Sequence, residues 1–98
     1  MGAAGNRKTI FITGGASGIG AATAKHFVKN GWFAGLYDID AEKLAQTAAE
    51  IGADNCVSGR LDVRDRAEWT AALNHFAEAT DGRMDVLVNN AGLARVGG

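Results

Sequence analysis

Proline is absent from the 98 residues, cysteine occurs once, and histidine occurs twice. A single cysteine, Cys56, excludes an internal disulfide bond and fits a reducing compartment. Cys56 with the two scattered histidines, His26 and His75, makes no recognisable metal site. We therefore expect a cytoplasmic protein that has neither a metal centre nor a disulfide bond.

Long apolar runs and an excess of one charge are also missing. No run approaches the ~20 residues needed to cross a bilayer, and residues 1–6 are too short and polar for a secretory signal. The net charge of −1 offers no electrostatic attraction to nucleic acid or to an anionic membrane. Neither nucleic acid nor a membrane is therefore an expected partner. Residues 1–6 are interpreted as a disordered leader or a cloning remnant.

Short apolar segments alternate with segments of helical periodicity. Residues 8–13, 32–37, 55–61 and 86–88 predict strands, and residues 18–30, 41–51 and 66–80 predict helices. Asp40 and Asp65 are suited to cap the second and third helices, and Trp69, Leu73 and Phe76 predict a buried stripe on the third. The order βαβαβαβ predicts an α/β fold: a partial Rossmann-type, doubly wound parallel sheet with strand order 3-2-1-4.

A glycine-rich turn, TGGASGIG, joins the first predicted strand to the first helix at residues 13–20. A helix that starts at the carboxyl edge of a parallel sheet presents unpaired N–H groups and partial positive charge, which suit a phosphate. Gly14 allows the tight exit from the strand, Gly18 lets a pyrophosphate approach, and Gly20 lets the helix pack closely on the sheet. Ser17 adds a hydroxyl donor. A flexible loop is the alternative, which the βαβ context disfavours.

Asp38 closes the second predicted strand, 18 residues after Gly20. A carboxylate there accepts hydrogen bonds from both hydroxyls of an adenosine ribose and repels a 2′-phosphate. Ile39, rather than a basic residue, follows it, and Ser17 is not basic, so NAD is favoured over NADP. The alternative is a loop carboxylate at the start of the next helix, although Asp40 already occupies the capping position.

Four motifs together resemble the short-chain dehydrogenase/reductase family. They are TGxxxGxG at 13–20, Asp38, Leu61-Asp62-Val63, and Asn89-Asn90-Ala91-Gly92. The resemblance covers residues 8–92 and implies contacts to the parts of a dinucleotide. The pyrophosphate would meet Ser17, Gly18 and Ile19, and the adenosine ribose would meet Asp38 and Ile39. The adenine amino group would meet the Asp62 carboxylate beside the Val63 backbone, and the nicotinamide ribose would meet Asn90, Ala91 and Gly92.

Two of these motifs also have a structural interpretation. Asp62 could form a salt bridge to Arg60 or Arg64, and the two asparagines could serve as turn residues after a strand. In the family, the first asparagine, here Asn89, helps to tie the central strands together.

The resemblance also shows what the chain lacks. The family uses a Tyr as acid and base, a Lys four residues later, a Ser at the substrate carbonyl and an Asn in a proton relay. Tyr37 is the only tyrosine, Ala41 stands four residues after it, and the only serines are Ser17 and Ser58. No catalytic residue is therefore expected here. Residues 7–98 are interpreted as an NAD-binding half-domain, truncated before the catalytic half.

Three hypotheses for function follow. The favoured one is an NAD-dependent oxidoreductase that transfers a hydride between nicotinamide and an alcohol or carbonyl substrate, seen only through its cofactor-binding half and inactive in this form. A stand-alone nucleotide-binding or self-assembling module is the second, because residues 86–88 would otherwise expose an apolar sheet edge. A structural relic that binds nothing is the third. Expected partners are the dinucleotide, a small alcohol or carbonyl substrate, and further copies in a homo-oligomer.

Overall fold

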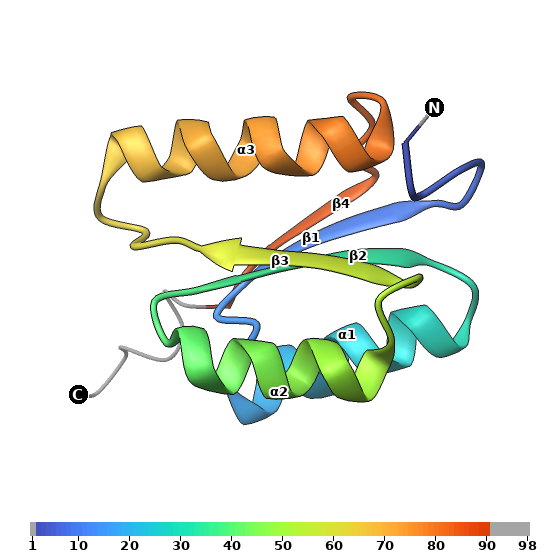
Figure 1. Cartoon of the computed structure of the whole chain (residues 1–98), viewed down its shortest axis with the longest axis horizontal. Coiled ribbons are helices and arrows are strands. Elements are labelled where there is room, and N and C mark those ends of the chain that lie inside the picture. The colour runs from blue at the N-terminus through green and yellow to red at the C-terminus, as the bar shows by residue number, and fades with distance from the viewer. Residues whose placement is uncertain (1, 91–98) are drawn as a thin grey trace.

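A computed structural model describes residues 2–90, which form a four-stranded parallel sheet with helices on both faces (Figure 1). The elements are β1 (Thr9–Thr13), α1 (Gly18–Lys29), β2 (Phe33–Asp38), α2 (Ala41–Ile51), β3 (Cys56–Arg60), α3 (Arg66–Thr80) and β4 (Val86–Asn89). The strands lie in the order β3-β2-β1-β4, which confirms the predicted fold class and strand order. The predicted bounds differ from these by single residues at several ends.

β1 is buried on both faces because the sheet separates two apolar clusters. Ile10 and Ile12 point to the face that α1 and α2 cover, and Phe11 points to the face that α3 covers. Side chains alternate between the faces of a strand, so a strand covered on both sides is apolar throughout. The doubly wound arrangement of Figure 1 follows from this pattern.

Aromatic rings fill the space between the sheet and α3. The Phe11 ring stacks on Tyr37 with a centroid distance of 4.5 Å and meets Phe76 edge-on at 5.3 Å. Gly35 in β2 makes room for Phe76, because a Cβ atom at this position would collide with the Phe76 ring. The aromatic contacts therefore fix the distance between α3 and the sheet.

The predicted buried stripe of α3 is wrong at Leu73. Phe76 is buried and Trp69 is half-buried, but 36% of Leu73 is exposed. Ala72 and Ala79 lie against the sheet in its place. Their small side chains let the helix approach closely around Phe76, which rotates Leu73 outward.

The prediction of a disordered leader is wrong for residues 2–6. These residues form turns that pack against the end of α3, where only 1% of Ala4 is exposed. The Ala4 N–H donates to the Ala79 carbonyl over 2.8 Å, and the Arg83 guanidinium donates to the Gly5 carbonyl over 2.8 Å. The last carbonyls of a helix lack intrahelical partners, so the segment supplies one of them with a donor.

We expect Phe76→Ala to lower the free energy of unfolding by about 3–5 kcal/mol, because it leaves a cavity among the aromatic rings. Leu73→Ala on the same helix is the matched control and should change it by less than about 1 kcal/mol. Urea denaturation followed by circular dichroism measures both. Equal losses for the two variants would contradict the packing described for α3.

Candidate functional site

The loops that follow β1, β2 and β3 surround a cavity of about 370 Å³ at the carboxyl edge of the sheet. Open α/β sheets bind ligands at this edge. Six residues predicted from the sequence line the cavity: Gly14, Ser17, Asp38, Ile39, Asp62 and Val63. The structure adds five more, which are Ala16, Asp40, Lys43, Leu61 and Arg64. The fold therefore brings together residues from three separate loops.

The turn contains four glycines, and Gly14, Gly18 and Gly20 are the three with predicted roles. Gly14 has a φ of 66°, a left-handed conformation that favours glycine. A Cβ atom at Gly20 would collide with the Gly14 carbonyl oxygen, so glycine at this position lets the start of α1 lie directly against the turn that follows β1. At Gly18, by contrast, no described atom lies within 4 Å of an added Cβ. Packing among residues 2–90 therefore does not require glycine at 18.

Ser17 is the N-cap of α1. Its hydroxyl accepts from the Gly20 N–H over 3.0 Å and donates to the Gly14 carbonyl over 2.8 Å. The hydroxyl hydrogen that we expected to face a ligand is therefore used inside the turn. The Asn90 side-chain amide also donates to the Ser17 oxygen over 2.8 Å. This contact links the end of β4 to the start of α1.

The N-terminus of α1 keeps its donors and its positive charge. Within residues 2–90, the N–H groups of Gly18 and Ile19 have no hydrogen-bond partner. The first turn of α1 contains no acidic residue, whereas the first turns of α2 and α3 contain Glu42 and Glu68. An acidic residue there would offset the helix dipole. α1 alone of these three helices therefore offers an uncompensated site for an anion.

Asp38 is held in place by two backbone donors. One carboxylate oxygen accepts from the Ala16 N–H over 3.0 Å, and the other accepts from the Asp40 N–H over 2.9 Å. Each carboxylate oxygen has two lone pairs, so each keeps one acceptor position. Asp40 caps α2 by accepting from the Lys43 N–H, as predicted. Asp38 thus acts as a loop carboxylate and still has acceptors for a ligand.

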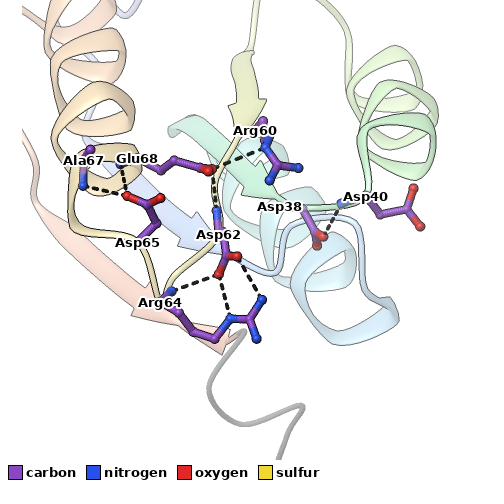
Figure 2. Close-up of polar contacts among 8 residues, drawn as sticks. All are labelled: Asp38, Asp40, Arg60, Asp62, Arg64, Asp65, Ala67 and Glu68. Atoms are coloured by element: carbon purple, nitrogen blue, oxygen red, sulfur yellow. Dashed lines mark hydrogen bonds and ion pairs between the residues drawn. The ribbon is translucent and has the colours of Figure 1, made fainter.

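Asp62 forms a forked ion pair with Arg64 (Figure 2). The Arg64 Nε and Nη2 atoms lie 3.0 and 2.9 Å from the two carboxylate oxygens, and the Arg64 backbone N–H adds a third bond of 3.0 Å. These hydrogen bonds lower the pKa of Asp62 to about 2. The predicted salt-bridge alternative is correct for Arg64, whereas Arg60 pairs with Glu68 over 3.4 Å.

Asn89 ends β4 and Asn90 follows it, and the two side chains have different partners. Asn89 accepts a 2.8 Å hydrogen bond from the Thr13 hydroxyl and so ties β4 to β1. Asn90 is 2% exposed and donates to Ser17 and to the Gly14 carbonyl. The predicted site residues Ala91 and Gly92 lie outside the described residues.

Tyr37 lies away from the cavity, in the aromatic cluster beneath α3. Its hydroxyl shares a 2.9 Å hydrogen bond with the His75 Nδ1 atom, and burial raises its pKa above the ordinary value. Among residues 2–90, no group of three acidic, cysteine or histidine side chains could hold a metal ion. In the same range, no helix is long and apolar enough to cross a membrane.

The fold and the cavity define a Rossmann-type α/β protein with its candidate site at the carboxyl edge of the sheet. The family model for short chain dehydrogenases matches residues 8–98. The chain belongs to this family, whose members bind a nicotinamide dinucleotide. The resemblance seen in the sequence motifs is thereby confirmed.

Several relatives carry the names of oxidoreductases. The chain is 45% identical over 87 residues to momilactone A synthase of Oryza sativa subsp. japonica, a match that covers 89% of this chain and 31% of the relative. It is 40% identical over 86 residues to a 2-dehydro-3-deoxy-L-rhamnonate dehydrogenase (NAD(+)) of a Sphingomonas strain, covering 88% of this chain and 33% of the relative.

A solved structure gives the same fold. The 3-ketoacyl-(acyl-carrier-protein) reductase of Brucella melitensis, complexed with NADH, superposes with a TM-score of 0.76 at 31% identity. That match covers 82% of this chain and 32% of the reductase. The chain therefore spans about a third of the length of the relatives that it matches.

Lys43 and Arg64 are the two cations among the cavity residues that the sequence did not predict as site residues. A signal for each was present. Lys43 is the third residue after the helix cap Asp40, which places it in the first turn of the helix beside the loop. Arg64 follows Asp62 by two residues, the spacing at which their side chains pair. Neither position belongs to the motifs that carried the resemblance.

We expect Gly20→Ala to lower the free energy of unfolding by about 1–3 kcal/mol, because its Cβ atom would force α1 away from the Gly14 carbonyl. Gly18→Ala is the control two residues away. Its Cβ atom enters open space, and alanine favours a helix, so stability should stay equal or rise by up to about 1 kcal/mol. Thermal unfolding measures both variants, and a greater loss for Gly18→Ala would refute the geometry of the turn.

Proposed function

We propose that this chain forms the NAD-binding part of an oxidoreductase that transfers a hydride between nicotinamide and an alcohol or carbonyl substrate. The observation that carries the proposal is Asp38, fixed at the end of β2 with one acceptor left on each oxygen. Two such acceptors match the two hydroxyls of an adenosine ribose.

The other residues of the site fit the remaining parts of the dinucleotide. The unpaired N–H groups of Gly18 and Ile19 lie where the pyrophosphate would bind, and the open space at Gly18 would admit it. Ile39, which is 49% exposed, and the half-buried Val63 line the cavity and offer apolar surfaces for the flat face of adenine.

The charges around the cavity favour NAD over NADP. A 2′-phosphate would lie next to the Asp38 carboxylate, which repels it. The Arg64 charge is engaged by Asp62, so it offsets this repulsion only weakly. Lys43 is the remaining cation of the cavity, and it lies beside the acidic pair Asp38 and Asp40. The names of two relatives, one bound to NADH and one NAD(+)-dependent, support the same choice.

Bound NAD would supply the hydride acceptor, and this chain would bind and orient it. The activity of the whole protein is part of the proposal, since the chain spans about a third of its relatives. In that proposal the acid–base residues and the substrate pocket belong to sequence beyond the described residues. A cytoplasmic location and a homo-oligomeric state stay predictions from the sequence.

We expect Gly18→Val to abolish NAD binding while the protein stays folded. The valine side chain enters the open space at the start of α1, where the pyrophosphate would approach, and its Cβ atom meets no described atom within 4 Å. Stability should change by less than about 1 kcal/mol. Isothermal titration calorimetry measures the Kd and thermal unfolding serves as the control. Unchanged binding would remove the glycine turn from the site.

Asp38→Ala should weaken NAD binding by about tenfold or more, because hydrogen bonds to a charged group contribute about 1.5–3 kcal/mol each. NADP should be affected less, since the variant no longer repels a 2′-phosphate. Asp54→Ala, an exposed carboxylate outside the cavity, is the control. Equal losses of affinity for NAD and NADP would show that Asp38 does not hold the ribose.

A further inference from the structure

Arg64 lines the cavity, although none of the motifs that identify the family includes it. Its side chain folds back on Asp62 from the loop between β3 and α3 (Figure 2). Three donors of one residue, the backbone N–H, Nε and Nη2, converge on that single carboxylate. An exposed surface pair seldom has this geometry, because two flexible side chains lose entropy when they are held together.

The three bonds leave the Asp62 carboxylate with one open position. Its Oδ1 atom accepts from both the Arg64 backbone N–H and Nε, which uses its two lone pairs. Its Oδ2 atom accepts only from Nη2, so one lone pair remains there. The low pKa of about 2 keeps this carboxylate ionised and therefore unable to donate near neutral pH.

The loop backbone is fixed separately from Arg64. The Asp62 N–H donates to the Glu68 Oε1 atom over 2.9 Å, and the same Glu68 oxygen pairs with Arg60. Asp65 caps α3 by accepting from the Ala67 and Glu68 N–H groups, as Figure 2 shows. Loss of the Arg64 side chain should therefore remove two of the three donors to the Asp62 carboxylate without releasing the loop.

We propose that Arg64 is a positioning residue that presents the last acceptor of Asp62 to the cavity, so that the site selects a 6-aminopurine over a 6-oxopurine. This inference rests on the proposed function, in which adenine occupies the cavity. The amino group of adenine donates one hydrogen bond to the open Oδ2 position. The 6-oxo group of hypoxanthine would place an acceptor against this acceptor, and both would stay unpaired.

The test compares NAD with nicotinamide hypoxanthine dinucleotide, which differs at position 6 of the purine. The Kd of each is measured by calorimetry for the full chain and for Arg64→Gln, Arg64→Lys and the control Arg66→Gln. Arg66 starts α3, is exposed and does not line the cavity. We expect the unmodified chain to prefer NAD by about tenfold or more.

Both Arg64 variants should reduce this preference by about threefold or more, because neither glutamine nor lysine reproduces the planar fork that orients the carboxylate. Arg66→Gln should keep the preference. A second readout needs no ligand: Arg64→Gln should raise the Asp62 pKa from about 2 towards 3.8, which carbon-13 NMR of the carboxyl groups measures. Thermal unfolding reports separately that the variant is folded, because an unfolded chain would also show the ordinary carboxyl pKa.

Several results would overturn the inference. If Arg64→Gln weakens both dinucleotides equally, Arg64 contributes only general attraction. If it weakens NADP more than NAD, Arg64 binds a phosphate. If the Asp62 pKa does not rise, the pair is not formed in solution. If the unmodified chain binds NAD but does not discriminate between the purines, the inference alone fails, whereas absence of NAD binding refutes the proposed function as well.

Discussion

The rest of the site depends on the hydrogen bonds that the Gly14 carbonyl oxygen accepts. It accepts from the Ser17 N–H over 3.1 Å, from the Ser17 hydroxyl, and from the Asn90 side chain. Gly20 lies so close to it that no side chain fits between them. This one oxygen holds the end of β1, the start of α1 and the end of β4 in a single arrangement. In this arrangement the N–H groups of Gly18 and Ile19 have no hydrogen-bond partner within residues 2–90.

Two carboxylates at the cavity, those of Asp38 and Asp62, are both held by hydrogen bonds from the protein. Asp38 and Asp62 both line the cavity, and each accepts hydrogen bonds from the protein and keeps at least one acceptor position. Their protein donors hold the carboxylates in one orientation before any ligand arrives, which reduces the ordering cost of binding. They differ in their partners: backbone N–H groups hold Asp38, which forms no ion pair within residues 2–90, whereas Arg64 pairs with Asp62. The negative charge of the site is therefore concentrated where a ribose would bind.

The sheet holds the loops that follow β1, β2 and β3 beside one another. β1 and β2 are buried on both faces, and α1, α2 and α3 cover them. β4 lies at the edge of the four-strand sheet within the described residues, and 46% of Leu87 there is exposed. The site lies at the carboxyl end, beside the best buried strands. Its geometry therefore depends mainly on β1 and β2, which are the core of the sheet.

The sequence by itself determined the element order, the strand order, the caps Asp40 and Asp65, and the grouping of Asp38 and Asp62 with the glycine turn. The element order, the strand order, the caps and the place of Asp38 depend on local spacing and on the rule that parallel strands end at one edge, whereas the place of Asp62 was implied by the resemblance to the family. Only the tertiary structure decided which residues meet. Leu73 turns outward because Ala72 and Ala79 pack around Phe76, and residues 2–6 dock because α3 ends beside them. The Asn90–Ser17 contact joins residues 73 positions apart. Such contacts depend on the relative placement of whole elements, which no local pattern encodes.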